Sequence, residues 1–420
     1  MKTKNIFLSL ISSIPQKIFF IVNLIIIFNL CSFSQGVWTQ KANFGGGITS
    51  SAIGFSIGTK GYIGTGDLPP SSTTNDFWEW DQSSNVWTQK ANFGGSARVA
   101  AISFSIGTKG YIGTGQNMGS NGLRDFWEYD PSTNSWTQKA NFAGSGRKGA
   151  IGFSIGNYGY IGTGSDSIGN CLNDFWQYNP SSDSWTKKTN FGGGARFGAV
   201  GFSMGSKGYI GTGTLQNTST TSDFWEWDQS SNLWTQKTNY GGGATTGATG
   251  FSIGNMGYLG TGHGTPTYNV FWQYNPVSDT WTQEASFAGA INKNREGAVG
   301  FSIGIKGYIG TGSETGGDKD DFWEYDASGG VGINTISLEK YFSISPNPFS
   351  MQTTLQAVRR LQNASLTVYN SVGQIVKDID NLSGQAIIFH RDNLASGLYF
   401  VRLTEENKTI AVDKLVITDK

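Results

Sequence analysis

The stretch that decides the fold is Gly61-Tyr-Ile-Gly-Thr-Gly66, because the chain contains it again and again. Six copies begin at Gly61, Gly110, Gly159, Gly208, Gly257 and Gly307, and the fifth has Leu259 in place of isoleucine. Successive copies are 49 residues apart four times and 50 residues apart once. A repeat of this length with strand-like content predicts supersecondary units that bury their apolar faces against one another.

The second copy shows what one repeat contains. We expect Arg98–Ile106 to form a first strand that ends in a Gly-Thr-Lys-Gly turn, and Tyr111–Gly115 to form a second. After a loop, Asp125–Asp130 is the expected third strand, and a Pro-Ser-Thr-Asn turn leads to the fourth at Trp136–Lys139. Four antiparallel strands joined by short turns predict one blade of a β-propeller.

The copies predict six blades that the N-terminal strand closes into a ring. The sixth copy ends at Asp326 and has no Trp-Thr segment after it. The missing segment stands near the start of the chain, at Val37–Lys41. Its Trp38 precedes Phe44 by six residues, the interval found between tryptophan and phenylalanine in the second repeat. We therefore expect Val37–Lys41 to complete the sixth blade.

These features resemble the kelch repeat, which has a glycine-flanked tyrosine strand, an aromatic-acidic strand and a tryptophan six residues before a turn. The resemblance covers residues 36–326 and implies an all-β fold, a six-bladed kelch-type β-propeller. The sequence departs from the usual kelch pattern in two places. It has Gly-Thr-Gly where a glycine pair is common, and Asp-Phe-Trp before the acidic strand.

Residues 1–35 have the order of a signal peptide. Three lysines precede or enter an apolar run at Ile18–Leu30, and small polar residues follow as far as Gln35. This order predicts export with cleavage near Gln35. Two alternatives stay open. A membrane anchor is disfavoured because spanning a bilayer takes about 20 apolar residues, and lipidation of Cys31 is disfavoured by the bulky Leu30 before it.

The composition agrees with many short strands and tight turns. Of 420 residues, 60 are glycine, and aromatic residues are as frequent as charged ones, at 14% each. The formal net charge is zero, so the chain lacks the basic footprint of a nucleic-acid-binding protein. Without residues 1–35, Cys171 is the only cysteine, so no disulfide can form within the exported chain.

The repeats stop at Asp326, and the remaining sequence divides into a predicted linker, residues 327–340, and a small domain, residues 341–420. Turn residues separate its apolar segments, which are Leu366–Tyr369, Ala386–Phe389, Leu398–Leu403 and Lys414–Ile417. This pattern predicts a small Ig-like β-sandwich.

Three phrases of the small domain resemble the C-terminal sorting domain of the Bacteroidetes type IX secretion system. They are Ser345-Pro-Asn-Pro-Phe349, Val368-Tyr-Asn-Ser-Val-Gly-Gln374 and Leu394–Leu403. The resemblance implies that the type IX secretion machinery recognises residues 341–420 and that the protein is secreted or displayed at the cell surface. An ordinary Ig-like adhesion module is the alternative.

The loops between the second and third strands differ completely among the six repeats, whereas the turns between the first and second strands and between the third and fourth are nearly constant. The six loops are Asp67–Asn75, Gln116–Arg124, Ser165–Asn173, Thr214–Ser222, His263–Val270 and Ser313–Asp320. In an up-and-down blade these loops share one face with the connections that enter the first strand. Since loops on a rigid scaffold commonly carry binding residues, this face is the predicted binding face.

Arginine recurs in register at the start of the first strand, on the same face. The four residues are Arg98, Arg147, Arg196 and Arg295, and Thr49 and Thr245 take the position in the other two repeats. Two interpretations stay open. A ring of guanidinium groups at the channel mouth would bind an anionic ligand through paired hydrogen bonds. Alternatively, each arginine pairs with a repeated acid of its own blade, such as Asp125 or Asp174.

Other candidates give weaker signals. His263 is the only histidine of the repeats, and Tyr268 is the clearest loop aromatic, so both are candidate ligand-binding residues. The repeated acids Glu79, Glu128, Glu226 and Glu324 alternate with Gln177 and Gln273, so we expect structural roles for them. The run Asp318-Lys-Asp320-Asp321 lacks the ligand spacing of a calcium loop.

The sequence predicts no catalytic residue, no metal site and no cofactor. A copper site of the galactose oxidase type needs two histidines and a tyrosine-linked cysteine, which repeats with one histidine cannot supply. Sugar-acid mutarotases, another kelch resemblance, use arginine and acids and remain the enzyme alternative. The favoured interpretation is an exported kelch propeller, without a transmembrane segment in the mature chain, that binds a protein or a glycan.

Overall fold

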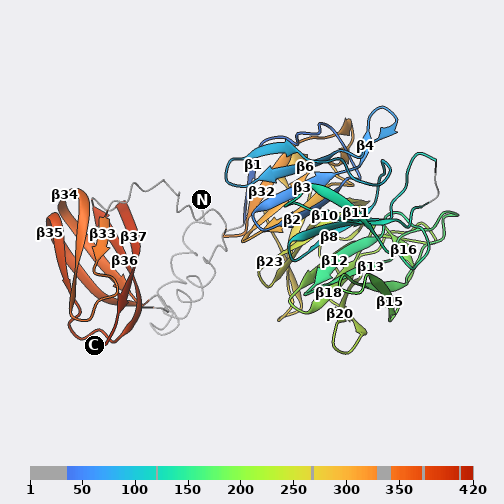
Figure 1. The fold of residues 1–420 in the computed structure, drawn as a ribbon. Coiled ribbons are helices and arrows are strands. Elements are labelled where there is room, and N and C mark those ends of the chain that lie inside the picture. The colour runs from blue at the N-terminus through green and yellow to red at the C-terminus, as the bar shows by residue number, and fades with distance from the viewer. Residues whose placement is uncertain are drawn as a thin grey trace, which may run out of the picture. The chain divides into compact units, whose positions relative to one another are not determined.

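The computed structural model describes residues 36–119, 122–265, 269–328, 342–370, 374–405 and 408–419. The chain divides into two compact units, residues 1–330 and 331–420, which we call the repeat unit and the C-terminal unit (Figure 1). The predicted signal peptide lies outside the described residues, as does most of the predicted linker. Strands dominate both units, and the short 3-10 helix η1 (Ala288–Ala290) interrupts them, so the predicted all-β class is confirmed. Within the described ranges, no helix is both long and apolar enough to cross a membrane.

Among the described residues of the repeat unit, six four-stranded antiparallel sheets follow one another, an arrangement consistent with a β-propeller. The first two are β2 (Ile53–Ile57), β3 (Lys60–Gly64), β6 (Phe77–Asp81) and β7 (Val86–Gln89), then β8 (Ile102–Ile106), β9 (Lys109–Gly113), β10 (Phe126–Asp130) and β11 (Ser135–Lys139). The next two are β12 (Ile151–Ile155), β13 (Tyr158–Gly162), β14 (Phe175–Asn179) and β15 (Ser184–Lys188), then β17 (Val200–Met204), β18 (Lys207–Gly211), β20 (Phe224–Asp228) and β21 (Leu233–Lys237). The fifth is β23 (Thr249–Ile253), β24 (Met256–Gly260), β26 (Phe271–Asn275) and β27 (Thr280–Gln283), and the sixth combines β28 (Val299–Ile303), β29 (Lys306–Gly310) and β32 (Phe322–Asp326) with β1 (Val37–Gln40).

The repeated glycine-tyrosine phrase is explained by packing between sheets. Gly110 on β9 faces Phe55 of the preceding sheet so closely that a β-carbon there would overlap the ring. The next residue, Tyr111, stacks on Phe126 of its own sheet at 5.6 Å and meets Tyr178 of the following sheet edge-on at 5.7 Å. Such aromatic pairs stabilise a fold by about 0.5–1.5 kcal/mol each beyond area burial. The glycine therefore leaves room for the phenylalanine ring of the preceding sheet, and the tyrosine that follows it contacts the next sheet.

The N-terminal strand β1 completes the sixth sheet, which is the pairing that the sequence predicts. It runs antiparallel to β32, with Val37 opposite Asp326 and Gln40 opposite Trp323. Its tryptophan, Trp38, lies 5.0 Å from the ring of Phe287 and donates a 3.0 Å hydrogen bond to the carbonyl of Ala285. Residues from the two ends of the repeat unit thus share one sheet.

The innermost strands form a closed circle. β2, β8, β12, β17, β23 and β28 contact one another in this order, and β28 contacts β2. The residues just before these strands form a ring of backbone hydrogen bonds, each donating its N–H to the carbonyl of the repeat before it at 2.9–3.0 Å. We call this the amide ring, and its members are Ser51, Ala100, Gly149, Gly198, Gly247 and Gly297. All six have φ between 51° and 63°, the left-handed region that glycine adopts without strain.

The amide ring corrects one predicted boundary. The first strand of the second repeat was expected over Arg98–Ile106, but β8 begins at Ile102. Ala100 has φ 51°, so the extended conformation cannot pass through it. The second strand, β9, ends at Gly113 rather than Gly115 because Thr114 is also left-handed, with φ 58°.

The C-terminal unit is built on one long strand. Its sheet has the order β33 (Phe342–Ser345), β34 (Gln352–Tyr369), β36 (Gly397–Glu405) and β37 (Lys408–Ile417), and β35 (Ile375–His390) pairs with β34. The four apolar segments that the sequence predicts as strands all lie within β34–β37. Alternate side chains of these strands, such as Leu366, Phe389, Val401 and Leu415, form a separate buried core.

We predict that deleting residues 36–42 destabilises the repeat unit. The deletion removes the packing of Trp38 and leaves one edge of β32 without its partner strand, which favours aggregation. Loss of a packed tryptophan alone costs about 3 kcal/mol. Thermal unfolding and solubility are compared with those of the intact chain and of Val37→Ala, a change at an exposed position of the same strand. An unchanged melting temperature in the deletion variant would contradict the role of β1.

Candidate functional site

A cavity of about 710 Å3 opens where the connections into the innermost strands meet. Its floor is made of the amide ring and of the six alanines that follow the ring residues, Ala52, Ala101, Ala150, Ala199, Ala248 and Ala298. The same alanines line a narrower space of about 160 Å3 between the inner strands. Because every repeat contributes the same small residues, the floor is nearly symmetric and carries no charged side chain.

The walls of the cavity are not symmetric. One wall is the hairpin of β4 (Asp67–Leu68) and β5 (Ser72–Thr73), and another is that of β30 (Ser313–Glu314) and β31 (Gly317–Asp318). Both belong to the variable loops of the sequence, from the first and the sixth repeat. The cavity therefore lies on the predicted binding face, and two of the six variable loops line it.

The residue before each amide-ring position is a further source of variation, which the sequence reasoning missed. In chain order these residues are Ser50, Val99, Lys148, Phe197, Thr246 and Glu296. Ser50, Phe197, Thr246 and Glu296 line the cavity, and Phe197 is 37% exposed. A position that holds six different residues inside an otherwise constant repeat was the signal that could have found them.

The charged side chains of the cavity lining are all acidic. They are Asp67, Glu296 and Asp318, and no lysine or arginine among the described residues lines the space. Burial raises the pKa of Asp67, and the nearby negative charge of Asp318 raises it further. Ionised carboxylates only accept hydrogen bonds, so the cavity suits groups that donate them, such as hydroxyls or cations.

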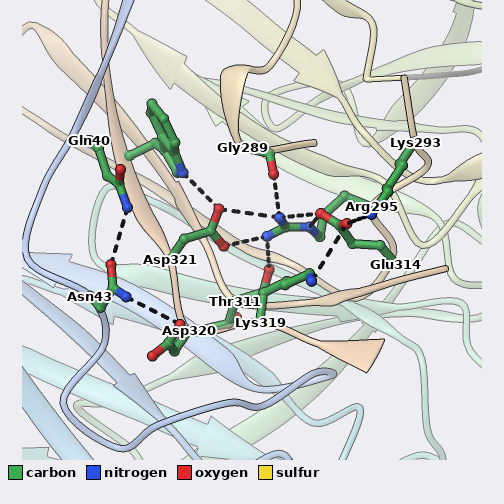
Figure 2. A network of polar contacts seen from close by, with 11 residues as sticks. Gln40, Asn43, Gly289, Lys293, Arg295, Thr311, Glu314, Lys319, Asp320 and Asp321 are labelled. Carbon is green, nitrogen blue, oxygen red and sulfur yellow. Dashed lines mark hydrogen bonds and ion pairs between the residues drawn. The ribbon is translucent and has the colours of Figure 1, made fainter. Parts of the chain in front are cut away.

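The four candidate arginines are buried in the segments that lead into the innermost strands and do not line the cavity. Arg98, Arg147, Arg196 and Arg295 are at most 1% exposed. Each guanidinium forms two hydrogen bonds with one aspartate, and the partners are Asp125, Asp174, Asp223 and Asp321. Asp125 and Asp174 are the partners named in the pairing interpretation of the sequence. Figure 2 shows the sixth repeat, where Arg295 lies between Asp321 and Glu314.

Each arginine connects three segments of its repeat. Arg98 donates to the carbonyl of Thr114, at the end of β9, at 2.9 Å and to that of Ser96 at 2.9 Å. Its guanidinium also lies 4.7 Å from the centre of the Phe93 ring. The indole of Trp127 donates to Asp125 at 2.8 Å. Burial raises the pKa of Asp125, but the hydrogen bonds and charge of Arg98 outweigh burial and hold the pKa below its ordinary value.

The two threonine repeats differ from each other. In the fifth repeat Thr245 replaces arginine, Val270 replaces the aspartate and Tyr240 replaces the phenylalanine. In the first repeat Thr49 replaces arginine, but Phe44 and Asp76 are kept. The fifth repeat thus lacks both charges of the pair, whereas the first lacks only the cation.

The remaining candidates lie elsewhere. His263 is exposed on β25 (His263–Thr265) and does not line the cavity, and Tyr268 lies outside the described residues. The repeated acids accept hydrogen bonds from tyrosines of the neighbouring strand, as Glu128 does from Tyr111 at 2.6 Å. In the part of the chain that the structure describes, no cluster of three or more histidine, cysteine or acidic side chains is arranged to hold a metal ion.

Comparison with known proteins bears on each unit separately. Residues 343–418 match the family model described as "Secretion system C-terminal sorting domain". A solved structure titled "Structure of YjhT" resembles the chain with a TM-score of 0.59 and 17% identity, covering 67% of this chain and 95% of that one. At this identity the likeness concerns the fold alone. No curated protein sequence matched the chain.

We predict that Arg147→Met lowers the free energy of unfolding by about 3–5 kcal/mol, because Asp174 keeps a partly buried charge without its partner. The double variant Arg147→Met with Asp174→Val imitates the fifth repeat and removes both charges. Its cost should be smaller than the sum of the two single changes by about 2 kcal/mol. Chemical denaturation of the four proteins of the cycle measures this. Strictly additive effects would contradict a structural ion pair.

Proposed function

We propose that residues 36–326 form a six-bladed kelch-type propeller and residues 341–420 an Ig-like sorting domain. Six four-stranded sheets, their inner strands in a closed circle and the pairing of β1 with β32 support the propeller. The single free cysteine of the described residues, Cys171, agrees with an exported chain held by packing alone. In this proposal residues 1–35 are a cleaved signal peptide and residues 327–340 a linker.

The C-terminal match supports secretion through the type IX system, to the cell surface or the extracellular space. We propose that residues 341–420 are recognised by the secretion machinery after export to the periplasm. The propeller then reaches the outside as the functional part of the protein.

The function that the geometry supports best is binding of a glycan or of a protein group at the variable-loop face. One observation carries this conclusion: a cavity of about 710 Å3 has a floor of small residues from every repeat, but its walls are the variable hairpins of the first and sixth repeats, and Ser50, Phe197, Thr246 and Glu296 complete its lining. The volume is in the range of small-molecule sites. Asp67, Glu296 and Asp318 accept hydrogen bonds from sugar hydroxyls or from a cationic side chain, and Phe197 offers one aromatic face.

The buried arginines favour this function over the sugar-acid mutarotase alternative. An enzyme that holds a sugar carboxylate through arginine needs an accessible guanidinium group. The four arginines are at most 1% exposed and already bind aspartates, and the cavity lining is acidic. An anionic ligand is therefore disfavoured at this site.

We predict that Asp67→Asn and Phe197→Ala each weaken ligand binding at least about tenfold, the size of one lost charged or aromatic contact. A glycan array and a pull-down of surface proteins with the mature chain identify the ligand, and calorimetry then compares the variants. Val277→Ser, at a 95% exposed position in the fifth repeat, is the matched control and should bind normally. Unchanged affinity in both cavity variants would remove the cavity from the binding site.

The raised pKa of Asp67 gives the binding a pH dependence. Binding requires the ionised carboxylate, so affinity falls as the pH is lowered through the pKa of Asp67, which lies above the ordinary aspartate value. The free energy of unfolding depends on pH in the opposite direction. It rises as the pH is lowered through the pKa of Asp67, because the folded state disfavours the charged carboxylate. Asp67→Asn should therefore raise the free energy of unfolding slightly at neutral pH while it weakens binding.

We predict that truncation after Asp326 leaves a folded repeat unit in the periplasm of the natural host type. Cell fractionation compares the truncated with the full-length protein, and the thermal unfolding of the recovered fragment establishes that it is folded. Normal surface display of the truncated chain would contradict sorting by residues 341–420.

A further inference from the structure

The first repeat keeps the groups that hold arginine in four other repeats, although it has no arginine. In the second repeat the guanidinium of Arg98 is held by Asp125, the Thr114 carbonyl and the Phe93 ring. The corresponding groups of the first repeat are Asp76, the Thr65 carbonyl and Phe44, with Trp78 in the place of Trp127. We call these four residues, Phe44, Thr65, Asp76 and Trp78, the arginine receptor.

The aromatic walls of the receptor have the geometry of a filled site. The rings of Phe44 and Trp78 are 6.2 Å apart at 73°, and those of Phe93 and Trp127 are 6.1 Å apart at 73°. Phe44 also meets Trp87 at 5.1 Å and 82°, close to the 5.1 Å and 84° of the pair in the second repeat. The Phe44 and Trp78 rings are therefore as far apart as the corresponding rings of the second repeat, although the first repeat has no arginine beside them.

The polar groups of the receptor have no partners of their own. The indole N–H of Trp78 is buried and donates to no atom of the described chain. The counterparts in the four repeats with an arginine donate to aspartate at 2.7–2.8 Å, whereas Trp272 of the fifth repeat, like Trp78, has no partner among the described residues. Within the described ranges the half-buried carboxylate of Asp76 accepts no hydrogen bond and forms no ion pair. Thr49 does not replace the guanidinium, because its hydroxyl donates to the Asp67 carbonyl at 2.7 Å.

The fifth repeat shows that the fold does not require the carboxylate at this position. There the aspartate is replaced by Val270, so losing the arginine leaves no carboxylate behind. A half-buried carboxylate and a buried indole N–H without partners both cost free energy. The fifth repeat also keeps a buried indole N–H without a partner, that of Trp272, so the carboxylate of Asp76 is what sets the first repeat apart. Keeping this carboxylate is explained if a cation from outside the repeat unit completes the site.

We propose that the arginine receptor binds a guanidinium group supplied from outside the repeat unit. The group would form paired hydrogen bonds with Asp76, donate to the Thr65 carbonyl and lie against the Phe44 ring, as Arg98 does in its own repeat. Asp76 would then accept the hydrogen bond of the Trp78 indole. A guanidinium fits better than an ammonium because the receptor offers a planar fork of acceptors beside an aromatic face.

A guanidinium from solvent would enter the receptor at its carboxylate, because the arginines of the equivalent sites are themselves at most 1% exposed. In the filled sites the aspartate side chains remain 17–22% exposed, so this part of each repeat lies at the surface. The receptor is covered by the loop Gly45-Gly46-Gly47-Ile48, in which Ile48 is 47% exposed and a β-carbon on Gly47 would meet nothing within 4 Å. Thr49 is followed by Ser50, which lines the cavity. An arginine bound to the receptor would therefore lie beside the cavity and outside it.

The test observes the indole N–H of Trp78 by nitrogen-15 NMR in the full exported chain, with the signal assigned by its loss in Trp78→Phe. The probes are Nα-acetyl-arginine amide, guanidinium chloride and Nα-acetyl-lysine amide at matched ionic strength. We expect a saturable shift with the two guanidinium compounds, at least tenfold weaker binding of the lysine compound, and loss of the shift in Asp76→Asn. The indole of Trp272 in the fifth repeat has no acid beside it and serves as the internal control, which should not move.

A second variant tests the same site without added ligand. Thr49→Arg should fill the receptor from within, raise the melting temperature by about 2–4 °C and abolish the response to guanidinium. The tripeptide Gly-Arg-Gly tests whether the guanidinium comes from a polypeptide or from a small molecule. Tighter binding than that of Nα-acetyl-arginine amide assigns it to a polypeptide, and equal binding assigns it to a small molecule. No saturable shift of Trp78, or a shift that survives Asp76→Asn, would overturn the proposal. Asp67→Asn should leave this response unchanged, so its failure is separate from that of cavity binding.

Discussion

The amide ring is the constraint on which the rest of the repeat unit depends. Six backbone N–H groups each donate to the carbonyl of the preceding repeat, and the last closes on the first. The ring requires a left-handed conformation at every member, which glycine supplies in four repeats and which Ser51 and Ala100 adopt against their preference. Because the circle is closed, no repeat can be lost without leaving a donor and an acceptor unpaired.

The same constraint separates architecture from recognition. Around the ring only small side chains fit, so the floor of the cavity consists of glycine, alanine and serine in every repeat. Chemical variety therefore has to come from positions that the ring does not restrict. These are the residues just before the amide-ring positions, such as Phe197 and Glu296, and the hairpins that carry Asp67 and Asp318. A nearly symmetric scaffold thereby presents an asymmetric cavity.

The sequence predicts the features that are encoded within one repeat. The strands follow from alternation and turn residues, and the pairing of β1 with β32 follows from the spacing of Trp38 and Phe44. The cavity did not follow, because Asp67 and Asp318 are far apart in the chain and come together only when the ring closes. The position of a residue within the repeat does not reveal where its side chain points. The sequence therefore left open whether Arg98 faces a ligand or Asp125, and the structure shows that it pairs with Asp125.

The arginine pairs explain why one part of the variable-loop face differs from the rest. A buried ion pair is weak evidence for net stability, and the fifth repeat shows that the fold tolerates its replacement by Thr245 and Val270. What the pair does supply is positioning: Arg98 holds the entering loop through Ser96, the end of β9 through Thr114, and the start of β10 through Asp125. The first repeat lacks this internal clamp, yet it contributes the hairpin of β4 and β5 to the cavity wall. This cavity wall therefore belongs to a repeat in which the entering loop is joined to the hairpin by the Thr49 hydroxyl, which donates to the Asp67 carbonyl, and not by an arginine.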